Sequence, residues 1–411
     1  GYYATGDGGD ALYKRVISEP AHAGKVQSAD GAWWELSEEE PSVKMFGAKA
    51  DGANDDTASL QAAIDYCSAK FSGGMVRLAN GVHLISSSLI WKDHVSMRGE
   101  GQTSSTIKAT GSMVRMISMI NLWLSGVSLE RFRVDGVQGQ TVGLYVEQTV
   151  VGTGETVGHL QMSDVQFVNH LNGLDGAGVF ALFDSSLTKV DFIQCTGAGA
   201  FIQGSGMNFY GCTFRVCGDG VRIAYLAGGS IGGPRFFGGV WVQNNFDVTF
   251  DGSLIRPCQF YGCWMEMCKT GVFATYNSGG AVNFLGVKVD GCLFQPDSTS
   301  PGAAIWNVAS FNGSVTFSDC VVVNSPSVNA DLPNRYYNPG AGGVLSVSSS
   351  VRTNGADSWQ VLPDFTTNTL VNMRGVFSDR KYPDDASAGA AGLLQGDIYY
   401  NTSTAFLTMK N

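Results

Sequence analysis

Charged and aromatic residues recur at matching positions of a phrase that repeats along the second half of the chain. The phrase is Phe-x-x-small/apolar-x-apolar-x, and its four clearest copies begin at Phe209, Phe237, Phe260 and Phe284. If its first, fourth and sixth residues face a core, its fifth and seventh face outward, because side chains alternate along a strand. The fifth positions hold Thr213, Trp241, Trp264 and Lys288, and the seventh hold Arg215, Gln243, Glu266 and Asp290. We therefore expect carboxylates, tryptophans and cations on one outer face.

The carboxylates Glu266 and Asp290 have the types and spacing for general acid catalysis. One coil apart, their Cβ atoms would be about 5 Å from each other, near the roughly 5 to 5.5 Å between the carboxyl groups of retaining glycosidases. Repulsion between like charges beside Trp264 would raise the pKa of one, so we expect Glu266 to be the acid. Asp290 would be the nucleophile, or the base at the wider separation of inverting enzymes. Asp247 and Asp251, in the segment NNFDVTFDG, are a reserve pair for that separation.

The other outward residues suit sugar binding. Tryptophan rings lie well against the C–H faces of sugars, so Trp241 and Trp264 are expected substrate contacts. Arg215, Gln243 and Lys288 would bind hydroxyl or acidic groups. An alternative stays open, because outward residues of an associated solenoid can be buried against a neighbouring chain. The tryptophans would then be interface anchors, and the glutamate a paired structural charge.

The spacing of the repeats indicates what positions these residues. The four copies are 28, 23 and 24 residues apart, and a weaker copy begins at Phe317. A period near 24 with two-residue alternation is typical of one coil of a parallel β-helix, an all-β solenoid. The first and fourth residues can both face inward only if the chain bends between them, and glycines 211, 238, 239, 262 and 286 supply that bend. A β-sandwich is the alternative, but it gives no reason for the repeat.

A single amphipathic helix precedes this region. Asp55, Asp56 and Thr57 come just before Leu60, Ala63, Ile64 and Cys67, a spacing that puts the apolar residues on one helical face. Strand-like sequence follows to about residue 325. We therefore expect a cap over residues 43–72, with its helix near 57–69, on a parallel β-helix over 73–330.

Composition excludes several classes of protein. Glycine accounts for 54 of 411 residues and only 15% are charged, which argues against disorder, coiled coil or a mainly helical fold. A net charge of -10 argues against a nucleic-acid partner. Nine cysteines without a CxxC pair, and five histidines without metal-ligand spacing, indicate reduced thiols, no metal and no cofactor. No apolar run is long enough to insert in a bilayer.

The segment VKMFGAKADGANDDTASLQAAID, residues 43–65, resembles the opening of pectate-lyase-like right-handed parallel β-helix proteins. The likeness is strongest to bacteriophage tailspikes that degrade surface polysaccharide. GYYATGDGGDALYKRV and DGAWWEL, within residues 1–42, are similar to the short neck before the helix of such tailspikes. The resemblance carries no catalytic motif onto a numbered residue of this chain.

The resemblance implies a setting for the protein. It implies a homotrimer on the virion tail, attached to the phage tail or baseplate through an N-terminal part outside this sequence. The chain begins with glycine rather than methionine, so we expect the native protein to be longer. The implied partner is a bacterial surface polysaccharide, either a capsule or an O-antigen.

The last part of the chain, residues 331–411, has short β-like segments of a different kind. Its GDIYYNTSTAFL resembles a β-hairpin phrase common near the ends of phage tail fibres. We expect a separate β region for trimerisation or adhesion. The alternative is that this region continues the solenoid.

Together these features favour a tailspike that depolymerises polysaccharide, with hydrolysis as the first interpretation. A lyase is the enzymic alternative, in which Lys288, Arg215 or a tyrosine would serve β-elimination next to a uronate. A non-catalytic adhesin, which binds the glycan without shortening it, is a third interpretation.

Overall fold

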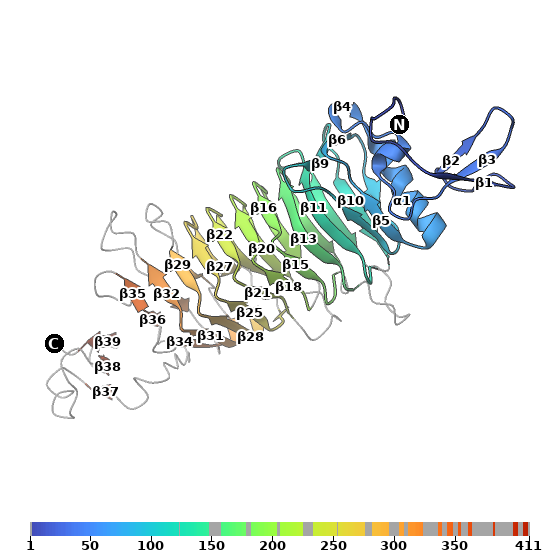
Figure 1. The fold of residues 1–411 in the computed structure, drawn as a ribbon. Coiled ribbons are helices and arrows are strands. Elements are labelled where there is room, and N and C mark those ends of the chain that lie inside the picture. Colours follow the sequence, from blue (N-terminus) through green and yellow to red (C-terminus); the bar gives the residue numbers. More distant parts are fainter. Residues whose placement is uncertain are drawn as a thin grey trace. The chain divides into compact units, whose positions relative to one another are not determined.

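In a computed structural model of the chain (Figure 1), the structure describes residues 2–122, 124–147, 158–177, 182–203, 206–224, 233–252, 254–275, 282–295, 304–307 and 311–323. Beyond these it describes the strands at 336–338, 343–347, 352–354, 361–363, 381–382, 398–401 and 406–409. The chain forms two compact units, one that extends to Arg222 and one that begins at Ile223.

The first unit begins with a small antiparallel sheet. It consists of β1 (Tyr13–Val16), β2 (Lys25–Gln27) and β3 (Trp33–Leu36), in the order β1-β3-β2. The Tyr66 hydroxyl, from the helix described next, donates a hydrogen bond of 2.8 Å to the Leu36 carbonyl at the end of β3. This buried contact joins the neck segment to the cap.

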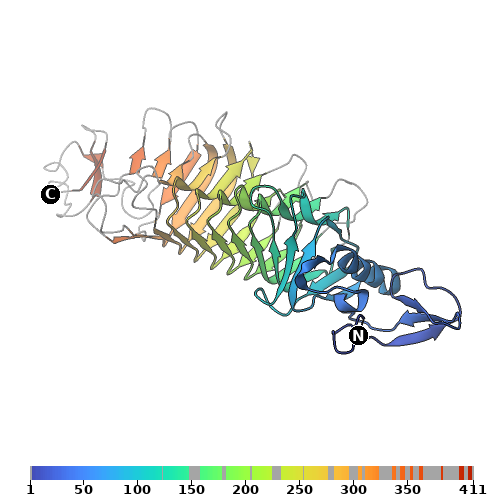
Figure 2. The same ribbon diagram turned by 90° about the horizontal axis from the view of Figure 1, so that it is seen from above.

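The cap consists of η1 (Val43–Phe46), β4 (Asp51–Asp55) and α1 (Thr57–Phe71). The expected helix near 57–69 is confirmed, and its predicted apolar face, Leu60, Ala63, Ile64 and Cys67, is buried. Figure 2 shows α1 and the neck at the same end of the first unit's coils.

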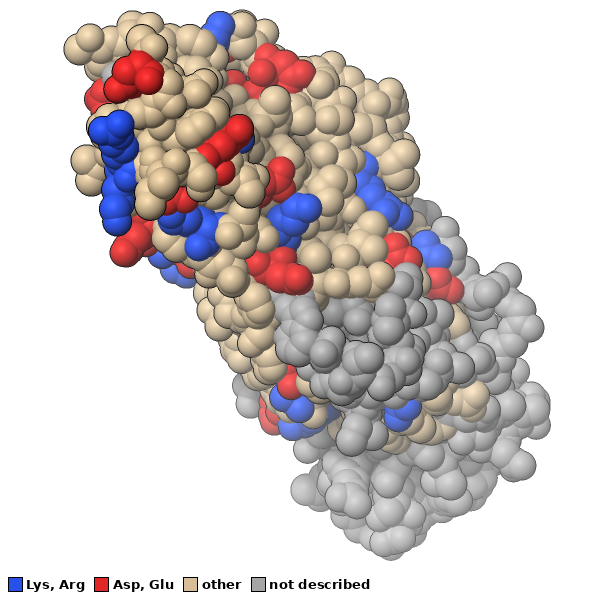
Figure 3. Space-filling view, turned by 90° about the vertical axis from the view of Figure 1, so that its right-hand side faces the viewer, with Lys and Arg blue, Asp and Glu red and all other residues tan. Residues whose placement is uncertain are grey.

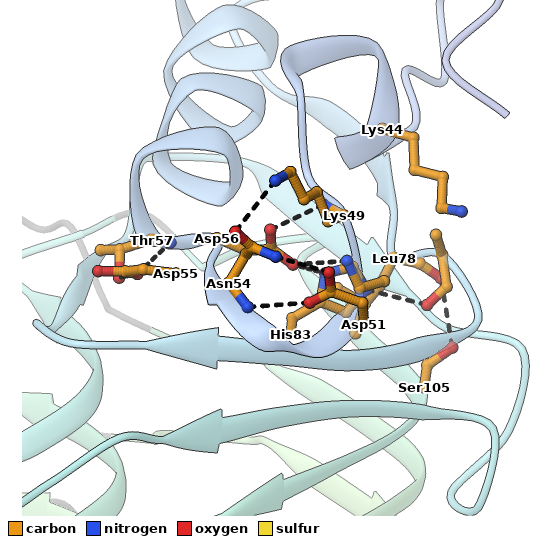
Figure 4. Close-up of polar contacts among 12 residues, drawn as sticks. Lys44, Lys49, Asp51, Asn54, Asp55, Asp56, Thr57, Leu78, His83 and Ser105 are labelled. Carbon is orange, nitrogen blue, oxygen red and sulfur yellow. Dashed lines mark hydrogen bonds and ion pairs between the residues drawn. The ribbon is translucent and has the colours of Figure 1, made fainter. Parts of the chain in front are cut away.

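Asp56, directly before α1, fastens the cap to the first coil rather than capping the helix with its side chain. Its Oδ2 lies 3.0 Å from Nδ1 of His83 on β6 (Gly81–Ile85), and its carboxylate accepts the backbone amides of Lys49 and Ala50 (Figure 4). Burial alone would raise the pKa of Asp56, but these hydrogen bonds lower it. The segment ADGANDDT therefore positions α1 through a buried polar cluster.

The solenoid of the first unit has two kinds of strand. One parallel sheet, here called the β7–β20 sheet, contains β7 (Leu89–Ile90), β10 (Arg115–Ile120), β12 (Val142–Glu147), β14 (Asn172–Ala177), β17 (Ala198–Ile202) and β20 (Asp219–Ala224). The other strands of the coils are β5 (Gly74–Arg77), β6, β8 (Val95–Arg98), β9 (Ser105–Ala109), β11 (Ser128–Asp135), β13 (Gln161–Val168), β15 (Ser186–Thr188), β16 (Asp191–Ile193), β18 (Asn208–Tyr210) and β19 (Thr213–Arg215). Neighbouring coils pair in parallel, so equivalent residues form columns along the unit.

The core of the first unit contains one such aromatic column. The rings of Phe167 and Phe192 stack with centroids 5.4 Å apart, and those of Phe192 and Phe214 with centroids 5.1 Å apart. Glycines of the β7–β20 sheet make room for these rings: a Cβ on Gly173 would lie 2.6 Å from Phe192 Cδ1. Packing of the two sheets therefore requires glycine at this position.

The second unit repeats this architecture. Its parallel strands include β21 (Arg235–Phe237), β22 (Val240–Val242), β24 (Leu254–Ile255), β25 (Cys258–Tyr261), β26 (Trp264–Glu266), β28 (Val282–Asp290) and β29 (Leu293–Gln295), here called the β21–β29 sheet. It also contains β23 (Phe246–Asp251), β27 (Gly271–Thr275), β30 (Ala304–Asn307), β31 (Phe311–Ser318) and β32 (Val321–Val323). The all-β parallel β-helix is confirmed. All nine cysteines are buried free thiols, as expected.

The predicted bends are confirmed at three glycines and displaced at a fourth. Gly211, Gly238 and Gly262 have φ of +57°, +63° and +57°. The equivalent residue of the next coil is Gly291, with φ +60°, because Phe260 pairs with Val289 and not with Phe284. Phe284 pairs with Ile255 of β24, one strand earlier, so its alignment with the repeat is wrong.

A second correction concerns the adjacent phenylalanines of β21. Phe236, not Phe237, pairs with Phe260 and stacks on it with a centroid distance of 4.8 Å. A shift of one residue exchanges the two faces of a strand. The predicted inward and outward positions of β22 are therefore reversed.

Parallel pairing continues past residue 330, further than predicted. β33 (Tyr336–Asn338) pairs with β30, β34 (Gly343–Val347) with β31, β35 (Arg352–Asn354) with β32, and β36 (Val361–Pro363) with β33. A separate sheet follows, of β37 (Lys381–Tyr382), β38 (Ile398–Asn401) and β39 (Phe406–Met409). Its antiparallel β38–β39 pair confirms the terminal hairpin. A role for residues 331–411 in trimerisation or adhesion stays a prediction.

Candidate active site

A cluster of charged and aromatic side chains lies on the outer surface of the β7–β20 sheet. We call it the Asp175 cluster, and its members are Arg115, Tyr145, Glu147, Asn172, Asp175, Phe201 and Arg222. In β12, Leu144 and Val146 are buried. Because side chains alternate along a strand, Tyr145 and Glu147 point outward. The parallel register then places Asp175 opposite Tyr145, and Phe201 opposite Asp175.

Tyr145 links a cation to a carboxylate within this cluster. The guanidinium carbon of Arg115 lies 3.3 Å from the centroid of the Tyr145 ring. The Tyr145 hydroxyl donates a hydrogen bond of 2.9 Å to Oε2 of Glu147. Burial, together with this bond to Glu147, raises the pKa of Tyr145 to about 12, so the phenol stays protonated and holds the carboxylate in place.

Asp175 occupies a different environment. Burial raises its pKa above the ordinary aspartate value, even though Arg115, Arg222 and the hydrogen bond from Asn172 all lower it. The Asn172 amide donates to Oδ2 at 3.0 Å. On the other side, Arg222 lies over the Phe201 ring at 5.0 Å from its centroid. Asp175 is thus a partly desolvated carboxyl that retains its proton to higher pH than an exposed aspartate.

Glu147 and Asp175 lie on neighbouring strands, two residues apart in the register. Tyr145 pairs with Asp175, and Glu147 pairs with Ala177. A strand spacing of about 4.8 Å and a two-residue rise of about 6.6 Å give roughly 8 Å between the Cα atoms of Glu147 and Asp175. Inverting glycosidases hold their two carboxyl groups about 6.5 to 9.5 Å apart, with room for a water molecule, and a Cα spacing of this size is compatible with that separation.

Reasoning from the phenylalanine repeat missed this cluster, because its strands carry a different phrase. The segments GLYV, GLDG, GAFI and GVRI begin at Gly143, Gly173, Gly199 and Gly220. Each has glycine, an apolar or small inward residue and then the outward residue that belongs to the cluster. This second, weaker repeat was the signal that could have located Tyr145, Asp175, Phe201 and Arg222.

Several of the residues predicted from sequence do lie exposed on the β21–β29 sheet. Trp264 is 44% exposed, and Glu266 is half-buried beside it on β26. Lys288 Nζ lies 2.9 Å from Oδ2 of Asp290, and this bond lowers the pKa of Asp290. Gln243 is exposed at a bend with φ +57°.

These residues do not form the expected facing carboxylate pair. Glu266 pairs with Gln295 of the next coil, whereas Asp290 pairs with Tyr261. The expectation that Glu266 and Asp290 stand opposite each other is therefore wrong. The physical reason is the alignment of Phe284, which displaced the fourth copy by five residues.

The outward placement of Trp241 and Asp247 is also wrong. Trp241 is fully buried, pairs with Met265 and packs against the rings of Phe236 and Phe260. Asp247 is fully buried, accepts a hydrogen bond of 3.0 Å from the Asn244 amide, and has its pKa raised by burial. 

The last two predicted residues lie on separate strands. Asp251 is half-buried at the end of β23. Arg215 is exposed on β19 of the first unit.

Comparison with known proteins supports the fold and the setting. Residues 41–123 match the family model of rhamnogalacturonase A/epimerase, pectate lyase-like. A capsule KN3-specific depolymerase of Klebsiella phage KN3-1 is 25% identical over 207 residues, which is 42% of this chain and 25% of that protein. The predicted resemblance is confirmed.

Two further proteins resemble the chain, one in sequence and one in structure. A mannuronan C5-epimerase of Azotobacter vinelandii is 32% identical over 181 residues, covering 35% of this chain and 32% of that protein. The full-length tailspike protein 2 of an Escherichia coli O157:H7 bacteriophage aligns with a TM-score of 0.57 at 17% identity, over 83% of this chain and 47% of that one. The chain spans about a quarter to a third of the two curated relatives named here.

On the face drawn in Figure 3, basic and acidic side chains are interspersed over the described surface. Among the residues that the structure describes, no group of three or more His, Cys, Asp or Glu side chains could hold a metal ion. No helix in the described ranges is long and apolar enough to cross a membrane.

Proposed function

We propose that this chain is part of a bacteriophage tailspike that depolymerises a bacterial surface polysaccharide, a capsule or an O-antigen. The capsule-specific depolymerase among its relatives and the tailspike fold support this setting. The predicted homotrimer and attachment to the phage tail or baseplate belong to the same proposal, and sedimentation of the purified protein tests the trimer.

The proposed reaction is glycoside hydrolysis at the Asp175 cluster. The observation that carries it is a pair of carboxyls on neighbouring strands in contrasting environments, one partly desolvated and one held by a phenol. Such a pair divides the roles of acid and base between its members.

Three residues of the cluster have defined tasks in this reaction. Protonated Asp175 donates its proton to the glycosidic oxygen as the bond to the anomeric carbon breaks. Glu147, held by Tyr145, takes a proton from a water molecule that attacks the anomeric carbon from the opposite side. The products are a new reducing end and a free hydroxyl, with inversion at the anomeric carbon.

Hydrolysis is favoured over β-elimination because of Tyr145. A lyase needs a base to remove the proton at carbon 5 of a uronate, and Tyr145 is the tyrosine of the cluster best placed for it. Its pKa of about 12 and its donation to Glu147 keep it protonated near neutral pH. The lyase remains the second candidate, because Arg115 and Arg222 could neutralise a uronate carboxylate.

The residues predicted from sequence stay a second proposal. Trp264, Lys288 and Gln243 are offered as glycan contacts on the β21–β29 sheet, with Glu266 and Asp290 as alternative catalytic carboxyls. That surface has exposed aromatic area and a cation, since Lys288 Nζ lies 5.2 Å from the Tyr261 ring centroid.

The proposed function is tested by applying the purified protein to lawns of encapsulated strains and then to the polysaccharide of any strain that shows a halo. Hydrolysis predicts a rise in reducing ends without a new ultraviolet chromophore. An unsaturated uronate in the products would establish the lyase. Tight binding with unchanged chain length would establish the adhesin.

A further inference from the structure

A hollow lies on the first unit, at the N-terminal end of α1. It is a cavity of about 730 Å³ between the first turns of α1 and the turn that leads into β7. Its wall includes Thr57, Ala58, Gln61, Asp65, Ser87 and Lys92. This volume is within the range of small-ligand pockets, about 300 to 1,000 Å³.

The walls of this cavity are fixed by hydrogen bonds. The Ile90 amide donates to Oε1 of Gln61 at 2.8 Å, and the Gln61 amide donates to the Ile90 carbonyl at 2.9 Å. Gln61 therefore joins α1 to the edge of the β7–β20 sheet. Across the hollow, the hydroxyls of Thr57 and Ser86 both donate to the carboxylate of Asp55 (Figure 4 shows Asp55 and Thr57). The cavity is a preformed feature of the cap.

The cavity adjoins the strands that carry the Asp175 cluster. Ile90 of β7 pairs with Ser118 of β10, and the Ser88 hydroxyl donates to the carbonyl of Arg115 on the same strand. The order β7-β10-β12-β14 puts three strand spacings, about 14 Å, between the edge of the cavity and Asp175. A polysaccharide lying across these strands would reach both places.

The lining chemistry selects a class of ligand. The wall combines apolar surface with hydroxyl and amide side chains, Lys92 lies 3.8 Å from Asp65, and Asp55 adds a second carboxylate. Ile90, which is 51% exposed, offers an apolar surface for the C–H face of a sugar. With two carboxylates and one ammonium, the cavity disfavours an anionic sugar and suits a neutral, hydroxyl-rich one.

We propose that the cavity beside α1 is a distal subsite that binds a neutral sugar unit of the polysaccharide cleaved at the Asp175 cluster. The inference rests on the proposed function and adds a second place of contact to it. A distal subsite contributes binding of the long chain, so it acts on KM and leaves kcat for the chemical step unchanged.

The test is a pair of matched substitutions on α1. Ala58→Tyr fills the cavity from an exposed position of its wall, and Ala69→Tyr adds the same ring at an exposed position later on the same helix. The substrate is capsular polysaccharide purified from a strain that shows a halo. We expect Ala58→Tyr to raise KM about 10-fold or more with kcat within twofold, and Ala69→Tyr to match the unmodified protein.

Chain length provides the internal control. Oligosaccharides too short to span about 14 Å should be cleaved equally by all three proteins. Equal KM values on the long polysaccharide would overturn the subsite, as would an equal loss on short fragments. If Ala58→Tyr fails to fold, Ser87→Tyr obstructs the same cavity from the β7 side and is subject to the same criteria.

The subsite and the proposed catalysis fail in different ways. If the unmodified protein binds the panel's capsular polysaccharides without cleaving them, hydrolysis is wrong, and the dissociation constant of labelled polysaccharide takes the place of KM. Ala58→Tyr should then weaken binding by about 10-fold, and unchanged binding would overturn the subsite. A protein that neither binds nor cleaves any of them overturns both.

Discussion

Each unit has an aspartate on its outer surface, and the pKa values of these two aspartates are shifted in opposite directions. On the β7–β20 sheet, burial raises the pKa of Asp175 above the ordinary aspartate value. On the β21–β29 sheet, the bond to Lys288 lowers the pKa of Asp290 and keeps it ionised. A salt bridge favours the ionised carboxylate, whereas partial desolvation favours the protonated acid. Environment, more than residue type or repeat position, therefore distinguishes a catalytic candidate from a structural charge.

The largest expected effect comes from the base of the proposed reaction. Glu147→Gln keeps the size of the side chain and can still accept from Tyr145, but it cannot take a proton from water. We expect kcat to fall by about 100-fold to 10,000-fold, the usual contribution of general base catalysis. Asp290→Asn, in the β21–β29 sheet, is the matched control and should stay within a few-fold of the unmodified protein. A reversed outcome would move the catalytic site to the second unit.

Trp241 and Trp264, both in the second unit, sharpen the contrast between core and surface. Trp241→Ala removes a fully buried ring and should lower the free energy of unfolding by about 3 to 5 kcal/mol. Trp264→Ala removes an exposed ring and should leave stability within about 1 kcal/mol. Thermal or denaturant unfolding measures both. Equal losses of stability would mean that the positions of these tryptophans relative to the core are misassigned.

A smaller effect is expected from the phenol that holds the base. Tyr145→Phe removes the hydrogen bond to Glu147 but keeps the ring beneath Arg115. We expect kcat to fall about 10-fold with KM nearly unchanged, because Tyr145 positions the base without touching the scissile bond. A loss as large as that of Glu147→Gln would instead indicate direct proton transfer by the tyrosine, as in the lyase.

The smallest expected effect is a shift of the pH profile. A general acid must be protonated, so activity should fall as pH rises through the raised pKa of Asp175. The positive charge of Arg222 lowers that pKa, so Arg222→Gln should move the basic limb to higher pH by less than about one unit. Movement to lower pH would contradict the role of Asp175 as the acid.

Much of the fold could be predicted from the sequence, because its signals are local. The helix begins where an Asp-Asp-Thr sequence precedes apolar residues at helical spacing, and the structure has α1 at Thr57–Phe71. The glycine bends at 211, 238 and 262 follow from the steric need for positive φ. The terminal hairpin was recognisable from its own phrase.

The site could not be predicted in the same way, because it depends on register between coils of unequal length. Because Phe236 and Phe237 are adjacent, the sequence does not decide which of them faces inward on β21. The alignment on Phe237 shifted the predicted register by one residue and placed Trp241 on the wrong face of its strand. Gly286 has the sequence position expected for the bend, but in the structure the equivalent bend residue is Gly291. The burial that raises the pKa of Asp175 is a property of the packed sheet and has no signature in its neighbours along the chain.

The most direct test of the central claim compares Asp175→Asn with Glu266→Gln on one polysaccharide. Both substitutions replace a carboxyl group with an amide and nearly preserve side-chain size. If catalysis takes place at the Asp175 cluster, Asp175→Asn loses at least about 100-fold in kcat/KM while Glu266→Gln stays within a few-fold of the unmodified protein. Full activity of Asp175→Asn, with the loss falling on Glu266→Gln, would contradict it.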